Sequence, residues 1–89
     1  MSESSAALKE EIKRAIVRSL RLPMAPEEIE DGVSLFGEGL GLDSIDVLEL
    51  VLEIERTFGV SISDEQTGAK VLRSVNTIAD YITAARNPT

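Results

Sequence analysis

The residues with the clearest chemical potential form one short run in the middle of the chain. Ser44 directly follows Asp43, and a glycine-containing approach leads up to them, Gly39-Leu40-Gly41-Leu42. Either side chain is suited to cap a helix, because its oxygen can accept a hydrogen bond from a free backbone amide. The same position suits a phosphate, which would meet unpaired amides and the positive end of the helix dipole. The run therefore predicts a helix cap or a phosphodiester attachment point on Ser44.

The chain contains no cysteine and no histidine. The missing cysteine excludes disulfides, thiolate zinc sites and a catalytic thiol. The missing histidine removes the usual general base. We therefore expect Ser44 to be modified by another enzyme rather than to act as an autonomous nucleophile. Nothing in the sequence separates a catalytic carboxylate from the many solvated ones, so we expect no catalytic residue. No calcium-loop spacing is present, so we expect no metal site.

The segment after Ser44 has the periodicity of an amphipathic helix. Placing its residues at about 100° per position gives a core face with Leu50 at its edge, made of Val47, Val51, Ile54 and Phe58. The opposite stripe is charged and consists of Asp46, Glu49, Glu53 and Arg56. Ile45 and Leu52 project beside that stripe. The stripe is either a solvated helix face or, because two apolar residues widen it, a docking surface for a partner.

The elements that must position this run are helices. We expect an all-α fold with a single domain over residues 1–89 and helices at about 5–20, 44–58, 64–69 and 75–86. Every fourth residue is apolar in the first helix, Leu8, Ile12, Ile16 and Leu20, and the last helix has one apolar face, Val75, Ile78, Ala79, Ile82 and Ala85. Gly59 is expected to end the second helix, and residues 60–63 to form a connector.

A long connection separates the first two helices. Pro23 and Pro26 are expected to stop the first helix. Four apolar residues then follow within the connection, Ile29, Val33, Leu35 and Phe36. These anchors predict that the connection is an ordered loop.

Charge is distributed unevenly along the chain. Twelve of the 16 acidic residues, but only one of the nine basic residues, lie between Glu27 and Glu65. Nucleic acid and anionic membranes would be repelled by such a region, whereas basic surfaces of other proteins would be attracted. The acidity is otherwise explained by solubility alone. Charged residues interrupt the first 20 positions, and no apolar run is long enough to span a bilayer, so we expect a cytoplasmic monomer.

The chain resembles the acyl carrier protein family over essentially the whole domain. The resemblance lies in Gly41-Leu42-Asp43-Ser44-Ile45-Asp46, Glu49-Leu50-Val51, Glu53-Ile54-Glu55-Arg56-Thr57-Phe58-Gly59-Val60, Ile62-Ser63-Asp64-Glu65 and Ser74-Val75-Asn76-Thr77-Ile78-Ala79-Asp80-Tyr81-Ile82.

This resemblance implies a bundle of three main helices plus a short one, with 4'-phosphopantetheine transferred from coenzyme A to Ser44 beside the motif neighbour Asp43. The terminal thiol of the arm would hold acyl groups as thioesters in fatty acid, polyketide or related lipid biosynthesis. The implied partners are a phosphopantetheinyl transferase, an acyl–acyl carrier protein synthetase or acyltransferase, and a ketosynthase and other synthase enzymes with basic docking patches. The implied docking residues are Ile45, Asp46, Glu49, Leu52, Glu53, Glu55 and Arg56.

Some residues depart from the family pattern. Ile45 stands where leucine usually follows the serine, and Arg56 and Thr57 stand where fatty-acid carriers commonly have further acids. The departures suggest a specialised bacterial carrier with partners other than the general fatty-acid synthase. Three alternatives remain open: an aminoacyl or D-alanyl carrier, an unmodified adaptor of the same fold, and, ranked last, an enzyme that uses paired carboxylates.

Overall fold

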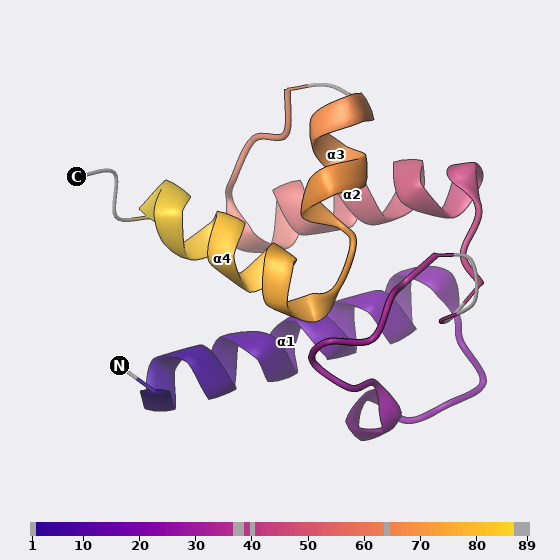
Figure 1. Cartoon of the computed structure of the whole chain (residues 1–89), viewed down its shortest axis with the longest axis horizontal. Helices are drawn as coiled ribbons and strands as arrows, with labels where there is room; N and C mark the ends of the chain where they lie inside the picture. Colours follow the sequence, from indigo (N-terminus) through magenta and orange to yellow (C-terminus); the bar gives the residue numbers. More distant parts are fainter. Residues whose placement is uncertain (1, 37–38, 40, 64, 87–89) are drawn as a thin grey trace.

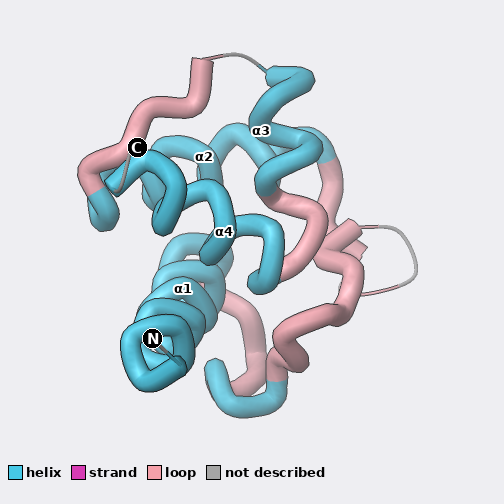
Figure 2. The backbone as a smooth tube through the Cα atoms, turned by 60° about the vertical axis from the view of Figure 1, so that its left-hand side comes forward, coloured by secondary structure: helices cyan, strands magenta, loops and turns pink. Residues whose placement is uncertain are grey.

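The protein is a bundle of α-helices joined by loops (Figure 1). The structure is a computed structural model that describes residues 2–36, 39, 41–63 and 65–86. Its elements are α1 (Ser2–Leu20), a single 3₁₀ turn η1 (Pro26–Glu28), α2 (Ser44–Phe58), α3 (Glu65–Val71) and α4 (Val75–Arg86). The expected all-α fold of three main helices and one short helix is confirmed. The tube in Figure 2 accordingly shows only helices and loops in the described part of the chain.

The helix bounds differ little from those expected. The first helix starts at Ser2 rather than near residue 5, and the short third helix extends to Val71 rather than 69. Asp64 and Leu40, which belong to the expected third helix and to the approach to Ser44, lie outside the described residues. Among the residues that are described, no helix is both long and apolar enough to cross a membrane.

Helix α1 contributes its apolar stripe to the core. Leu8, Ile12 and Ile16 are buried, whereas Leu20 is only partly buried. The helix ends when Arg21 adopts a left-handed backbone conformation with φ of 52°, and the Leu22 amide then donates to the Val17 carbonyl over 3.1 Å. This bond closes the helix as in a Schellman motif, before the prolines are reached.

The described part of the long connection between α1 and α2 is anchored to the core, as expected. Ile29 and Leu35 are buried in the core, whereas Val33 and Phe36 pack against it less completely. Backbone hydrogen bonds fix the loop to the turn between α3 and α4, because the Leu35 amide donates to the Arg73 carbonyl over 2.9 Å. The loop therefore fixes the approach to α2 through both packing and hydrogen bonds.

A second tie holds the same loop to α1. The Asp31 carboxylate lies 2.7 Å from the Lys13 ammonium and 3.8 Å from that of Lys9. The hydrogen bond from Lys13 lowers the pKa of Asp31. The Asp31 carbonyl also accepts from the Asn76 amide at the start of α4 over 3.0 Å. Asp31 thus links the loop to two helices.

Helix α2 buries a face that differs from the expected one. Leu50 and Ile54 are completely buried and form its centre, whereas Val47 and Val51 are only partly buried. The expectation that Leu50 lies at the edge was wrong. The reason is that α1, which runs antiparallel to α2 (Figure 1), packs along one flank more extensively than the short α3 packs along the other.

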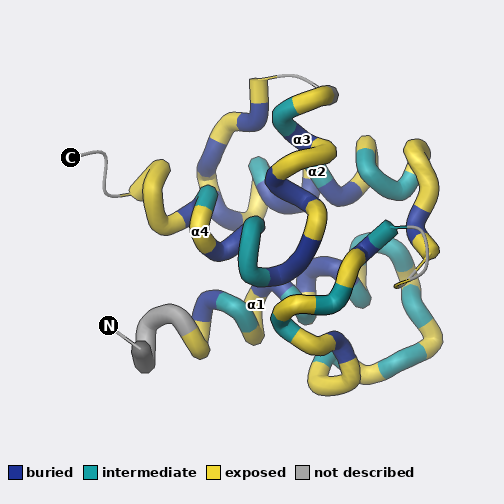
Figure 3. The backbone as a smooth tube through the Cα atoms, viewed as in Figure 1, coloured by how far each residue is buried: buried dark blue, intermediate teal, exposed yellow. Residues whose placement is uncertain are grey.

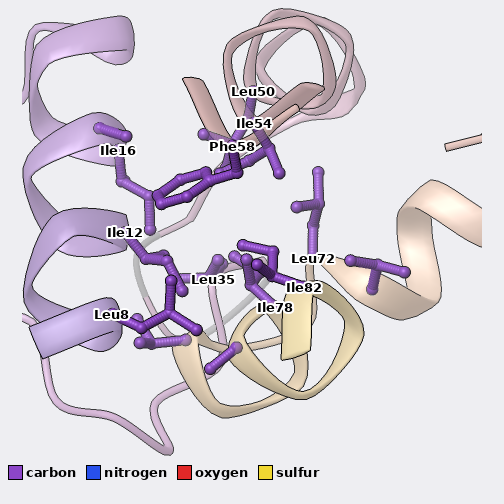
Figure 4. Packing of buried hydrophobic residues seen from close by; sticks show 14 of the residues in the cluster. Leu8, Ile12, Ile16, Leu35, Leu50, Ile54, Phe58, Leu72, Ile78 and Ile82 are labelled. Carbon is purple, nitrogen blue, oxygen red and sulfur yellow. The ribbon is translucent and has the colours of Figure 1, made fainter. Parts of the chain in front are cut away.

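The core lies where α1, α2 and α4 face one another. In Figure 4, Leu8, Ile12 and Ile16 point from α1 toward Phe58 and Ile54 of α2 and toward α4. The α4 face is buried at Val75, Ile78, Ala79 and Ile82, as expected, but Ala85 is exposed because it lies in the last turn, beyond the covering helices.

Residues 60–63 form an extended connector rather than a paired strand. Val60 and Ile62 are buried. The Ile62 amide donates to a carboxylate oxygen of Glu55 over 2.7 Å, and the Tyr81 hydroxyl donates to the Ser61 carbonyl. These side chains supply bonds that a neighbouring strand would otherwise provide.

Candidate functional site

The start of α2 is held by a reciprocal pair of aspartates. One carboxylate oxygen of Asp43 accepts from the amides of Ile45 and Asp46, each over 3.0 Å. The Asp46 carboxylate in turn accepts from the Asp43 amide over 3.0 Å. This is a capping box in which Asp43 is the N-cap. Of the two residues suited to the cap, the structure thus assigns it to Asp43.

Ser44 is consequently free of the capping role. It is the first residue of α2 and is exposed. Within the part of the chain that the structure describes, its hydroxyl group has no hydrogen-bond partner. A hydroxyl at this position can be reached from solvent, and a negative group attached to it would be stabilised by the helix dipole.

A largely apolar groove lies next to Ser44, between α2 and α3. It is lined by Ser44 and Val47 on α2 and by Gln66 and Ala69 on α3. Gly68 allows the two helices to approach closely, because a β-carbon at this position would lie 3.1 Å from a methyl carbon of Val51. The hydroxyl therefore opens onto a surface that can accommodate an aliphatic chain.

The outer face of α2 presents three large apolar side chains to solvent. Ile45 and Leu52, which the sequence places beside the charged stripe, are 67% and 63% exposed. Leu48 is 56% exposed and was not among the expected docking residues. Its spacing of three residues from Ile45 and four from Leu52 is the signal that would have identified it. Figure 3 shows the exposed and partly buried positions along this helix.

Fewer carboxylates of α2 are available for docking than the sequence predicts. Glu49 is exposed, but Asp46 holds the helix cap and Glu55 is bonded to the Ile62 amide. Glu53, expected to be exposed for docking, is only 6% exposed, so that expectation was wrong. On the outer face of α2, only Glu49 is an exposed carboxylate with no partner among the described residues.

Hydrogen-bond partners of Glu53 offset the cost of burying its carboxylate. Arg18 of α1 donates to one carboxylate oxygen over 2.5 Å and Arg56 donates to the other over 2.6 Å. The Thr57 hydroxyl donates to the first oxygen over 3.0 Å. The hydrogen bonds from Arg18, then Arg56, then Thr57 outweigh desolvation and lower the pKa of Glu53 to about 2. Glu53 therefore joins α1 to α2 as a carboxylate that stays charged at neutral pH.

Sequence comparison with known proteins identifies the family of this chain. The family model described as "Phosphopantetheine attachment site" matches residues 10–82. The chain is also 38% identical over 76 residues to the acyl carrier protein of Wolinella succinogenes, covering 85% of this chain and 93% of that protein. The chain belongs to the acyl carrier protein family. The resemblance found in the sequence is thereby confirmed.

Two further members of the acyl carrier protein family show the same extent of similarity. The acyl carrier protein of a Sulfurovum species is 36% identical over 81 residues, covering 91% of this chain and 97% of its own. The acyl carrier protein of Onion yellows phytoplasma is 40% identical over 74 residues, which cover 83% of this chain and 91% of that protein. The cofactor of this family is phosphopantetheine, and its members work with synthase and transferase enzymes.

Proposed function

We propose that the whole chain is a single carrier domain that holds acyl groups as thioesters on a 4'-phosphopantetheine arm attached to Ser44. The observation that carries the proposal is the division of roles at the head of α2. Asp43 caps the helix, so the exposed Ser44 hydroxyl is left for modification. The neighbouring groove, with Val47 and Ala69 in its lining, suits the aliphatic part of the arm or its cargo.

The residues present fit the cofactor in two respects. A phosphodiester on Ser44 would stand at the N-terminus of α2, where the helix dipole favours a negative charge. In the transfer reaction, the Ser44 oxygen forms the new bond to the phosphorus of the phosphopantetheine, and the nucleotide part of coenzyme A departs with the electron pair of the broken bond. The serine proton passes to a base of the transferase, since this chain has neither histidine nor cysteine.

The chain itself is accordingly non-catalytic and is modified and loaded by other proteins. We propose a phosphopantetheinyl transferase for the modification and an acyltransferase or acyl–acyl carrier protein synthetase for the loading. A ketosynthase or related synthase enzyme would then receive the cargo. Exposed Ile45, Leu48 and Leu52, together with Glu49, form the surface that these enzymes would contact.

The decisive experiment is intact-mass spectrometry of the chain after incubation with coenzyme A and a broad-specificity phosphopantetheinyl transferase. We expect a gain of one phosphopantetheine group, and no gain in the Ser44→Ala variant. Ser63→Ala is the matched control, because Ser63 is also an exposed serine shortly before a helix, and this variant should be modified normally. Unmodified wild-type protein, or modification that survives Ser44→Ala, would exclude Ser44 as the attachment point.

A second step identifies the class of cargo. The modified chain is incubated with fatty acyl and aminoacyl ligases, each with its own substrates, and the thioester products are detected by mass. We expect acyl products, because the relatives are acyl carrier proteins. Charging with amino acids alone would instead identify an aminoacyl carrier.

A further inference from the structure

The outer face of α2 changes its electrostatic character along its length. Near Ser44 it carries Glu49, but one turn beyond Leu52 it carries Arg56, which is highly exposed. Leu48, Leu52 and Arg56 are spaced four residues apart, so they follow one another along one side of the helix. An aliphatic row thus leads directly to a positive charge, in a chain whose net charge is −7.

A second arginine adds to this charge from α1. Arg18 and Arg56 share the single buried carboxylate of Glu53, so one of the two positive charges is not balanced by it. Their side chains are 64% and 79% exposed, although each guanidinium donates to Glu53. Arg21 and the exposed Glu49 line the same groove between α1 and α2, so that its lining holds three arginines and two glutamates, one of which, Glu53, is buried. The groove therefore presents more positive than negative charge to a visiting protein.

The arrangement also fixes how the guanidinium groups are presented. A guanidinium has five N–H donors, and Arg18 and Arg56 each use one of them on Glu53 within the described part of the chain. Because Glu53 is buried, it holds the two groups in place at the groove edge. Planar, positioned donors favour a carboxylate partner over a solvated counterion.

We propose that this end of the α2 face, defined by Leu52, Arg18 and Arg56, binds an acidic amphipathic segment of a partner protein. An aliphatic side chain of that segment covers Leu52, and a carboxylate beside it meets the two arginines. The inference rests on the proposed carrier function for the kind of partner. The partner surface expected at this end of α2 is therefore acidic rather than basic, because a uniformly basic docking patch would be repelled by Arg18 and Arg56.

The test uses two synthetic helical peptides with the same leucine face, one flanked by glutamates and the other by lysines. Each is titrated into the unmodified, ¹⁵N-labelled chain and followed by NMR. We expect the glutamate peptide to bind more tightly and to shift the amide signals of residues 52–57 and the side-chain N–H signals of Arg18 and Arg56. Added salt should weaken this binding, because the charges concerned are exposed.

Two single substitutions locate the interaction. Arg18→Gln and Arg56→Gln should each weaken binding of the glutamate peptide by about two- to fivefold, the range for one exposed ion pair. Each variant leaves the other arginine to pair with Glu53. Arg14→Gln is the matched control, because Arg14 lies one turn from Arg18 on α1 and is 62% exposed. Circular dichroism verifies folding, and Arg56→Lys, which keeps the charge, should bind better than Arg56→Gln.

The inference is overturned if the lysine peptide binds as tightly as the glutamate peptide, or if Arg14→Gln weakens binding as much as Arg56→Gln. Signal changes confined to other helices would also contradict it. The assay does not depend on modification of Ser44. If the chain accepts phosphopantetheine but does not discriminate between the peptides, only this inference is refuted. If it discriminates between the peptides but is not modified, only the proposed carrier function is refuted.

Discussion

Replacing Glu53 by glutamine tests whether the ion pairs between α1 and α2 stabilise the fold. The substitution keeps the shape of the side chain but removes the charge that Arg18 and Arg56 share. The pKa of Glu53 falls from 4.5 to about 2 in the folded chain. At 1.36 kcal/mol per pKa unit this corresponds to about 3 kcal/mol. Because solvent screens the exposed arginines, we expect a loss of about 1–3 kcal/mol at pH 7.

The pH dependence separates this electrostatic contribution from a packing effect. A carboxylate with a lowered folded pKa stabilises the protein above its unfolded pKa, and this stability is lost as the pH falls toward the folded value. The relevant window for Glu53 therefore lies between pH 4.5 and about 2. The difference in unfolding free energy between wild type and Glu53→Gln should be largest above pH 5 and should shrink as acid is added.

The assay is urea unfolding at a series of pH values from 7 to 3, followed by circular dichroism. Glu49→Gln serves as the matched control, because Glu49 lies on the same helix but is exposed, and it should change the unfolding free energy little. A difference between wild type and Glu53→Gln that stays constant over the whole pH range would refute the electrostatic reasoning. So would equal effects of the two substitutions at pH 7.

Three further outcomes are expected from the same structure. Asp43→Ala removes the N-cap of α2 and should lower the unfolding free energy by about 1–2 kcal/mol in urea titrations; an unchanged midpoint would show that the cap does not contribute. Leu50→Ala should destabilise the chain by about 2–5 kcal/mol, whereas Leu52→Ala should have almost no effect, and similar losses would contradict the assigned core face. Added salt should raise the melting temperature by screening repulsion among the carboxylates between residues 27 and 65, and a flat salt titration would count against that repulsion.

Much of the fold could be predicted because its signals are local. Spacing of apolar residues identified α1 and α4, and Gly59 ends α2 with a left-handed conformation, its amide donating to the Glu55 carbonyl over 2.9 Å. The loop anchors Ile29 and Leu35 were recognisable as apolar residues in an otherwise polar connection. These features depend on backbone geometry and hydrophobicity within a few residues.

The candidate site was predicted only in part, for a physical reason. The sequence by itself determined that α2 starts at the Asp43-Ser44 pair and that one of these residues caps it, because capping needs only neighbouring amides. Tertiary structure decided which face of α2 is buried and which carboxylates remain exposed. Glu53 is removed from the surface by Arg18, 35 positions away, and helical periodicity carries no information about such a distant partner. The sequence therefore determined where the helix begins, and only the packing of α1 against it decided what its outer face presents.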